Sequence, residues 1–173
     1  MKKFIFFLFI LLAPVLTSAQ VADSTTLTHV GSTCPSFTFE LDKGKTAQIT
    51  DYRGKIILIN FFATWCGPCR MELPRVQKEI WEKYQSDPKF ALFVFGREEG
   101  WDKVLGFKKA NNYTFAMLPD EHRKIYSLFA TQYIPRTLLI DEKGTILFQS
   151  VGYSTRDMDN LLALLGNKLG KTL

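Results

Sequence analysis

Residues 56–75, IILINFFATWCGPCRMELPR, contain two cysteines separated by two residues, Cys66 and Cys69. They follow the apolar run of residues 55–63, and a continuous run of this length predicts a strand buried on both faces. After Cys69, apolar residues recur at helical spacing, and Pro74 is expected to kink this helix. A cysteine pair between a strand and a helix can hold a metal, form a static disulfide or exchange electrons with another protein.

Residues 1–19 have the outline of a secretory signal peptide. Lysines precede the apolar stretch of residues 4–13, and the small residues at 17–19 suit a cleavage site. A membrane anchor is the alternative, but a spanning helix needs about 20 apolar residues, and Pro14 interrupts the run. We therefore expect residues 20–173 to be exported as one domain, periplasmic in a Gram-negative cell; the alternative is a membrane-anchored domain facing the periplasm. Disulfides persist in such a compartment.

Charge and composition restrict the function further. The formal net charge is +5, and lysines and arginines are scattered among acidic residues, so no nucleic-acid surface is expected. The chain is 46% apolar and 14% aromatic, which is typical of a globular protein. Three cysteines cannot all pair, so a disulfide-stapled framework is not expected.

The remaining pattern predicts an α/β sandwich with a central parallel β-α-β unit followed by an α-β-β-α unit. Strands are expected at residues 36–41 and 89–96, and a strand hairpin at 136–152 with its turn at Asp141 to Gly144. Helices are expected at residues 101–110, at 120–130, and after Ser154, where Asp157 completes a capping box.

The sequence WCGPC of residues 65–69, placed after a buried strand, resembles the thioredoxin active site, and Ile134-Pro135 resembles the cis-proline of that fold. Residues 30–166 are similar to the exported TlpA/ResA-like branch, through NFFATWCGPCRMELP and the strand and loop before it. The resemblance implies a thioredoxin-like α/β fold with a central mixed β-sheet flanked by helices. It also implies an N-terminal strand extension and an insertion between the central βαβ unit and the C-terminal hairpin.

The resemblance implies that Cys66 and Cys69 cycle between a dithiol and a disulfide. The positive end of a helix lowers a cysteine's pKa, so Cys66 is expected just before the first turn with an exposed, nucleophilic sulfur. Cys69 is expected to be more buried and to resolve the mixed disulfide. Gly67 and Pro68 fix the turn between them, and Trp65 is expected to pack beside Cys66 and shield it.

Three further positions, Glu72, Ile134 and Pro135, have a functional role by resemblance. Glu72 matches a glutamate that TlpA/ResA-like proteins use to tune or relay thiol protons; an ordinary surface glutamate is the alternative. Asn60 stands where cytosolic thioredoxins carry a buried aspartate. Pro135 is expected to follow a cis peptide that faces the cysteines, with an ordinary turn proline as the alternative. The backbone of Ile134 is then expected to pair with an extended substrate segment.

The sequence allows two interpretations of Cys34 and two of the loop of residues 96–103. Cys34 replaces a small residue of the family pattern; it is either a half-buried packing residue or a third redox thiol. Arg97, Glu98 and Glu99 are expected to be solvated charges, with a contact to a partner as the alternative.

The leading function is a thiol-disulfide oxidoreductase that reduces disulfides of exported proteins, for example in cytochrome c maturation. A membrane electron-transfer protein is the expected electron source, and neither a cofactor nor a metal is expected. A peroxiredoxin-like thiol peroxidase is disfavoured. The peroxidatic cysteine of those enzymes lies in a PxxxTxxC motif, whereas Cys66 follows FFATW. A non-enzymatic protein that binds a soft metal such as copper(I) is the third class. A zinc site is disfavoured, since Cys34, His29 and His122 are not spaced as a second ligand pair.

Overall fold

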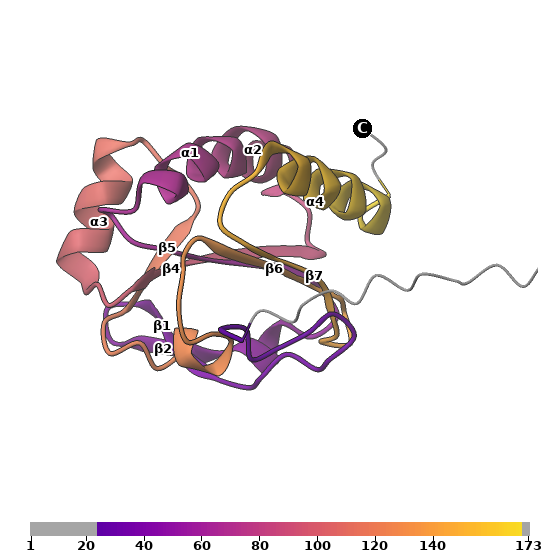
Figure 1. The fold of residues 1–173 in the computed structure, drawn as a ribbon, viewed down its shortest axis with the longest axis horizontal. Helices are drawn as coiled ribbons and strands as arrows, with labels where there is room; N and C mark the ends of the chain where they lie inside the picture. Colours follow the sequence, from indigo (N-terminus) through magenta and orange to yellow (C-terminus); the bar gives the residue numbers. More distant parts are fainter. Residues whose placement is uncertain (1–23, 171–173) are drawn as a thin grey trace, which may run out of the picture.

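Five strands form a central mixed sheet in the computed structural model, which describes residues 24–170 (Figure 1). The strand order is β5-β4-β3-β6-β7. Strands β3, β4 and β5 are parallel, and β6 is antiparallel to both β3 and β7. The bounds are β3 Ile56–Phe62, β4 Phe90–Arg97, β5 Ala116–Asp120, β6 Arg136–Ile140 and β7 Ile146–Val151. The thioredoxin-like architecture expected from the sequence is confirmed.

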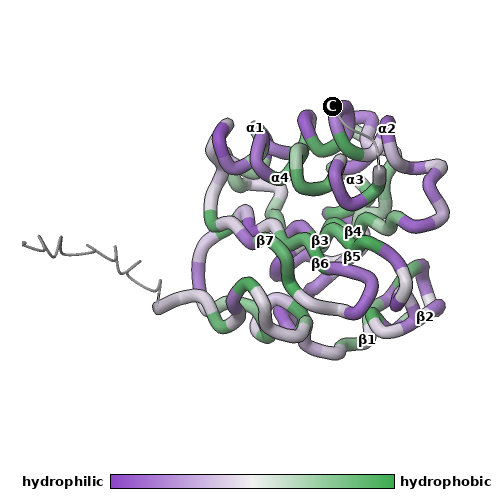
Figure 2. The backbone as a smooth tube through the Cα atoms, turned by 90° about the vertical axis from the view of Figure 1, so that its right-hand side faces the viewer, coloured by the Kyte–Doolittle hydropathy of each residue, from purple (hydrophilic) through white to green (hydrophobic). Residues whose placement is uncertain are grey.

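Strand β3 lies in the middle of the sheet, and all of its residues are buried. Side chains alternate between the two faces of a strand. Leu58 and Phe62 therefore join the apolar cluster on one face, while Ile59 and Phe61 join the cluster on the other. Figure 2 shows the hydrophobic strands lying between two layers that contain more hydrophilic residues. This double burial explains why the strand is a continuous apolar run.

Helices cover the first face of the sheet (Figure 1). As expected, Leu73, Val76 and Ile80 are buried along the helical segment that follows the cysteines. Helical bonding changes to the π type at Val76, two residues after Pro74, which has no N–H to donate. The bounds are α1 Gly67–Arg75, η2 Val76–Trp81, α2 Glu82–Tyr84, α3 Trp101–Ala110 and α4 Thr155–Lys168. Ser154 caps α4 by accepting the Asp157 N–H at 3.1 Å, as predicted.

An N-terminal hairpin covers the second face. Strands β1 (Thr38–Asp42) and β2 (Lys45–Gln48) form a separate antiparallel pair, and the short helix η1 (Ile49–Tyr52) follows. Phe37 and Phe39 lie in the aromatic cluster of this face, with ring centroids 6.0 and 5.6 Å from that of Phe95. This arrangement confirms the N-terminal strand extension, since edge-on aromatic packing attaches it to the sheet.

One expectation for the segment before the C-terminal hairpin is wrong, and one strand of this segment was not predicted. The helix expected at residues 120–130 is only the 3-10 turn η3 (Tyr126–Leu128). Asp120 instead accepts the N–H groups of Ile125 and Tyr126, and Arg123 has a φ of 58°, which a helix does not allow. Strand β5 was not predicted, and its sequence contains Pro119. Proline is tolerated there because β5 is an edge strand.

The signal segment expected at residues 1–19 lies outside the described residues. Within residues 24–170, no helix is both long enough and apolar enough to cross a membrane.

Candidate functional site

Cys66 and Cys69 form a disulfide at the start of α1, and their Cα atoms are 5.3 Å apart. Cys66 is the N-cap residue in extended conformation, and its sulfur accepts the Cys69 N–H at 3.3 Å. Pro68 falls in the first helical turn, where its missing N–H costs nothing. The positive end of the helix therefore points at the Cys66 sulfur and favours the thiolate once the disulfide is reduced.

One active-site cysteine is as buried as expected, and the other is much less exposed than expected. Cys69 is fully buried, as expected, whereas Cys66 is only 4% exposed and does not protrude from the surface. Its sulfur instead lines a pocket of about 430 Å³. A partner disulfide would therefore have to enter this pocket to meet the sulfur.

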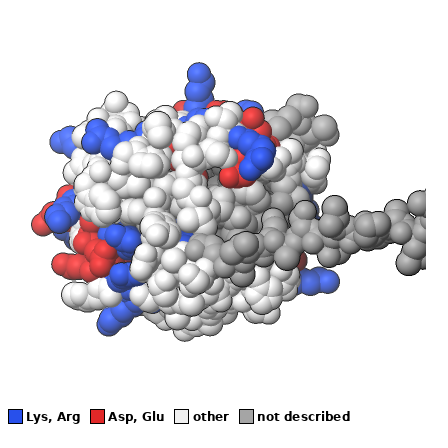
Figure 3. All heavy atoms as spheres, viewed as in Figure 1, with Lys and Arg blue, Asp and Glu red and all other residues white. Residues whose placement is uncertain are grey.

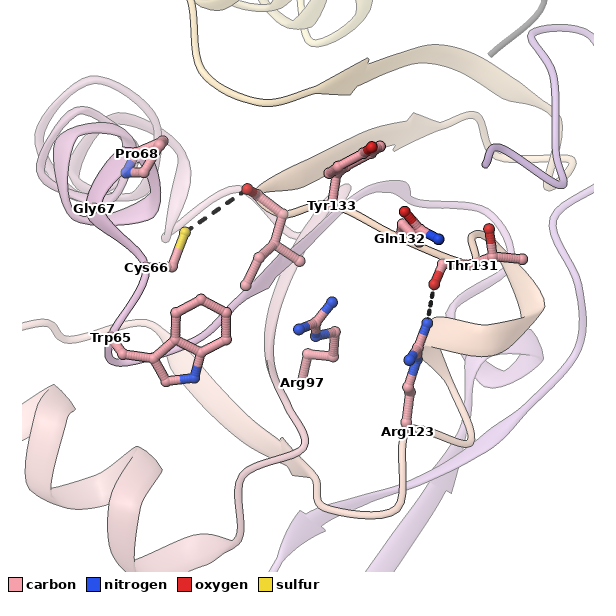
Figure 4. Close-up of a pocket in the computed structure, with 10 residues that line it drawn as sticks. Trp65, Cys66, Gly67, Pro68, Arg97, Arg123, Thr131, Gln132 and Tyr133 are labelled. Atoms are coloured by element: carbon pink, nitrogen blue, oxygen red, sulfur yellow. Dashed lines mark hydrogen bonds between the residues drawn. The ribbon is translucent and has the colours of Figure 1, made fainter. Parts of the chain in front are cut away.

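The segment before β6 forms the opposite wall of the pocket (Figure 4). The Ile134-Pro135 peptide is cis, as the resemblance implied. The Ile134 carbonyl oxygen lies 3.8 Å from the Cys66 sulfur. The Tyr133 carbonyl accepts the hydroxyl of buried Tyr126 at 2.6 Å, which fixes this wall to the helix η3. A backbone edge thus faces the disulfide directly.

Trp65 does not shield Cys66 by packing in the core, because the side chain is 67% exposed. Its ring stands at the pocket rim, with the Arg97 guanidinium carbon 5.8 Å from the ring centroid. An exposed indole at the mouth of a cavity is available for contact with a bound partner.

Glu72 lies on the sheet-facing side of α1 and is only 3% exposed, so the surface-glutamate alternative is wrong. Asn60 of β3 donates its amide to one carboxyl oxygen, and the Thr137 hydroxyl of β6 donates to the other, both at 2.8 Å. Burial raises the pKa of Glu72 from its ordinary 4.5 to about 7, although these two hydrogen bonds lower it. A carboxyl group with this pKa can either give or take a proton near neutral pH.

Glu99 was expected to be solvated but is buried, with 2% of its surface exposed. Its carboxylate accepts the Thr64 N–H at 3.0 Å and the Thr64 hydroxyl at 2.6 Å. These bonds hold the loop that leads into Cys66. No local signal in the sequence indicates this role, since Glu99 lies within a run of charged residues.

Cys34 is buried at 5% exposure in the aromatic cluster beneath the sheet. Burial raises the pKa of its thiol to about 11, so the thiolate is scarce at neutral pH. The packing interpretation of Cys34 is therefore the one that agrees with its surroundings.

Within residues 24–170, no group of three or more His, Cys, Asp and Glu side chains is placed to hold a metal.

On the face shown in Figure 3, charged side chains of both signs lie close together. Among the ion pairs of the described residues, Arg75 pairs with both Glu79 and Asp159.

Comparison with known proteins agrees with this geometry. Residues 30–149 match the AhpC/TSA family. The chain belongs to the AhpC/TSA family. The chain is also 31% identical to the thiol-disulfide oxidoreductase ResA of Geobacillus thermodenitrificans, over 76% of this chain and 75% of that protein. It is 32% identical to the thioredoxin-like protein YneN of Bacillus subtilis, over 78% and 79% of the two chains.

Comparison with a solved structure supports the same relationship at the level of the fold. The solution structure of a candidate protein disulfide isomerase from Bacteroides thetaiotaomicron superposes with a TM-score of 0.80. The alignment is 32% identical and covers 85% of this chain and 94% of the other. With a thioredoxin-like fold, a CxxC disulfide and such relatives, this AhpC/TSA family member is a thiol-disulfide oxidoreductase.

Proposed function

We propose that the chain reduces disulfides of exported proteins through Cys66 and Cys69, with assembly of c-type cytochromes as one candidate setting. The observation that carries the proposal is a disulfide at a helix N-terminus that opens into a pocket, opposite the backbone of Ile134. Such a pocket admits an extended chain, whereas a static disulfide would need no access. Export is proposed from the signal-like sequence of residues 1–19.

The reaction begins with the reduced enzyme. The Cys66 thiolate attacks one sulfur of the substrate disulfide, the substrate S–S bond breaks, and the other substrate sulfur leaves as a thiolate that takes up a proton. Cys69 then loses its proton and attacks the Cys66 sulfur. This step breaks the mixed disulfide, releases the second substrate thiol and leaves the Cys66–Cys69 disulfide. Two electrons have passed to the substrate, and a membrane electron-transfer protein is the proposed source that restores them.

Glu72 is proposed to take part in the second step as the proton acceptor for Cys69. It lies one helical turn after Cys69, and both residues are buried. A buried thiol ionises with difficulty because the interior stabilises its thiolate poorly. A carboxylate whose pKa is about 7 is basic enough to accept such a proton and acidic enough to return it.

The remaining residues are proposed to bind the substrate segment. The Ile134 backbone offers a strand-like edge beside Pro135, and Trp65 with Gly67 and Pro68 forms the opposite rim of the pocket. Main-chain pairing of this kind gives affinity without dictating sequence.

Trapping of the mixed disulfide tests this proposal. In a Cys69→Ser variant, Cys66 can attack a disulfide-bonded protein but the product cannot be resolved, so a covalent adduct that dithiothreitol releases is expected. Cys66→Ser should form none, and Cys34→Ser should behave as wild type. Absence of an adduct with Cys69→Ser, or equal adducts with Cys66→Ser, would contradict the proposal. Rapid consumption of hydrogen peroxide by the reduced wild type would favour a peroxidase instead.

A further inference from the structure

Two arginines line the pocket that contains Cys66, and they come from different segments (Figure 4). Arg97 ends strand β4, and Arg123 lies in the loop after β5. Their guanidinium carbons are 5.3 and 5.0 Å from the ring centroid of Tyr126, which is fully buried. Cation–π contacts to one ring therefore hold both cations at the same place.

The pair is partly removed from water, since the side chains of Arg97 and Arg123 are 13% and 30% exposed. Among residues 24–170, the Nε of Arg123 has no hydrogen-bond partner, and the Nε of Arg97 lies 3.2 Å from a Glu98 carboxylate oxygen without forming a hydrogen bond of good geometry. Arg123 donates instead to the Thr131 carbonyl, a neutral acceptor on the pocket wall (Figure 4). Partly desolvated guanidinium groups are stabilised by an anion, and a carboxylate, the anionic group that a polypeptide carries, matches their geometry.

Glu98 lies beside the pair but does not neutralise it. Its carboxylate is 3.2 Å from Arg97 and 3.8 Å from Arg123, and its side chain is 49% exposed. Two positive charges thus face one half-exposed negative charge. The net charge of this group is positive, so a second carboxylate entering the pocket would be attracted to it.

Tyr126 also connects the arginines to the substrate-facing backbone. The same side chain whose ring contacts both guanidinium groups donates its hydroxyl to the Tyr133 carbonyl, next to Ile134. The arginines and the cis-proline segment are therefore parts of one pocket wall. A strand advances about 3.3 Å per residue, so a residue two positions from a bound substrate cysteine lies only about 7 Å along the chain from it, and Cys66 and both arginines line the same pocket.

We propose that Arg97 and Arg123 form a carboxylate subsite that selects disulfide-bonded polypeptides with Asp or Glu close in sequence to the cysteine that Cys66 attacks. The inference rests on the proposed function and names the substrate class of that site. Substrates with Lys or Arg at this position are disfavoured by the same charges. Trp65, whose ring lies against Arg97, closes the rim of the subsite.

Activated peptides provide the test. Three peptides are identical except that Asp, Asn or Lys adjoins a single cysteine, which carries a neutral 2-thiopyridyl group through a disulfide. The thiolate of Cys66 attacks the peptide sulfur, thiopyridone leaves, and Cys69 then releases the reduced peptide. Absorbance of thiopyridone gives the second-order rate constant with residues 20–173 reduced and in excess. Glutathione activated in the same way represents a small acidic disulfide.

The expected result is a rate constant about tenfold or more higher for the Asp peptide than for the Asn peptide, in the order Asp, Asn, Lys. The Asp/Asn ratio should fall to about one in Arg97→Gln and Arg123→Gln, persist in Arg97→Lys, and rise in Glu98→Gln. Added salt should reduce the Asp/Asn ratio of the wild type, because it screens the charges. Arg156→Gln, on the exposed face of α4, is the matched control and should leave the ratio unchanged.

The outcomes separate this inference from the proposed function. Exchange with an Asp/Asn ratio near one in the wild type would overturn the carboxylate subsite while leaving the oxidoreductase intact. A ratio that persists in both glutamine variants would place the selectivity elsewhere and also overturn it. A higher rate with activated glutathione than with the Asp peptide would refute a polypeptide substrate. Absence of exchange with every peptide would contradict the proposed function and this inference together.

Discussion

Replacing Glu72 with glutamine should remove a pH dependence of stability that its burial creates. Burial raises the pKa of Glu72 from 4.5 to about 7. Below pH 4.5 the carboxyl is protonated in both the folded and unfolded states, and the free energy of unfolding carries no penalty from it. Between pH 4.5 and 7 the unfolded chain loses this proton first, so stability falls as the pH rises.

The size of the loss follows from the two pKa values. Their difference corresponds to about 3 kcal/mol at 25 °C, all of it lost by the time the pH exceeds the folded-state value. A glutamine keeps a carbonyl acceptor for Asn60 or Thr137 but cannot ionise. The stability of Glu72→Gln relative to wild type should therefore rise by about 3 kcal/mol between pH 4.5 and 8.

Urea unfolding of the oxidised protein at constant ionic strength measures this difference. Each variant is compared with wild type at every pH, so that the titration of other groups cancels. Glu142→Gln is the matched control, because this glutamate is exposed on the β6–β7 turn, and its curve should run parallel to that of the wild type. A parallel curve for Glu72→Gln would refute the assignment of a raised pKa to Glu72.

Three other predictions concern the buried side chains of Glu72, Glu99 and Cys34. The resolving step of the reaction, measured as release of substrate from the mixed disulfide, should depend on pH with an apparent pKa near 7 in wild type and lose that dependence in Glu72→Gln. Glu99→Ala should lower the free energy of unfolding by about 2 kcal/mol, because it leaves the Thr64 N–H without its acceptor; a loss no larger than that of Glu121→Ala in urea unfolding would contradict this. Cys34 should resist iodoacetamide in the folded oxidised protein at pH 7 and react after unfolding, as read by mass spectrometry; rapid modification of the folded protein would contradict its burial.

The elements with strong periodicity could be predicted from the sequence. Strand β3 and the helix after Cys69 follow from an uninterrupted apolar run and from helical spacing, because both patterns record which faces are buried. The cis peptide before Pro135 was predicted only through resemblance, since the sequence itself does not distinguish a cis proline from a trans one. Strand β5 was not predicted: it is short and contains Pro119, and a proline is acceptable there because β5 lies at the edge of the sheet.

The site depends more on distant contacts. Glu72 and Glu99 are both buried carboxylates, but only Glu72 was recognised, through its place after the cysteines. Glu99 is buried because the loop before Cys66 offers it two donors, and that partnership spans 35 residues. Arg97 and Arg123 are likewise brought together by the ring of Tyr126. Such groupings arise from packing between elements and leave no periodic trace in the sequence.

The reduction potential of the Cys66–Cys69 couple tests the central claim most directly. Residues 20–173 would be equilibrated against a thiol buffer, with Cys34→Ser as a parallel sample that removes the third thiol. A reductase should give a value near that of thioredoxin, about −270 mV, in both samples. A value near about −120 mV, typical of an oxidant that installs disulfides, or the absence of an exchangeable couple, would contradict it.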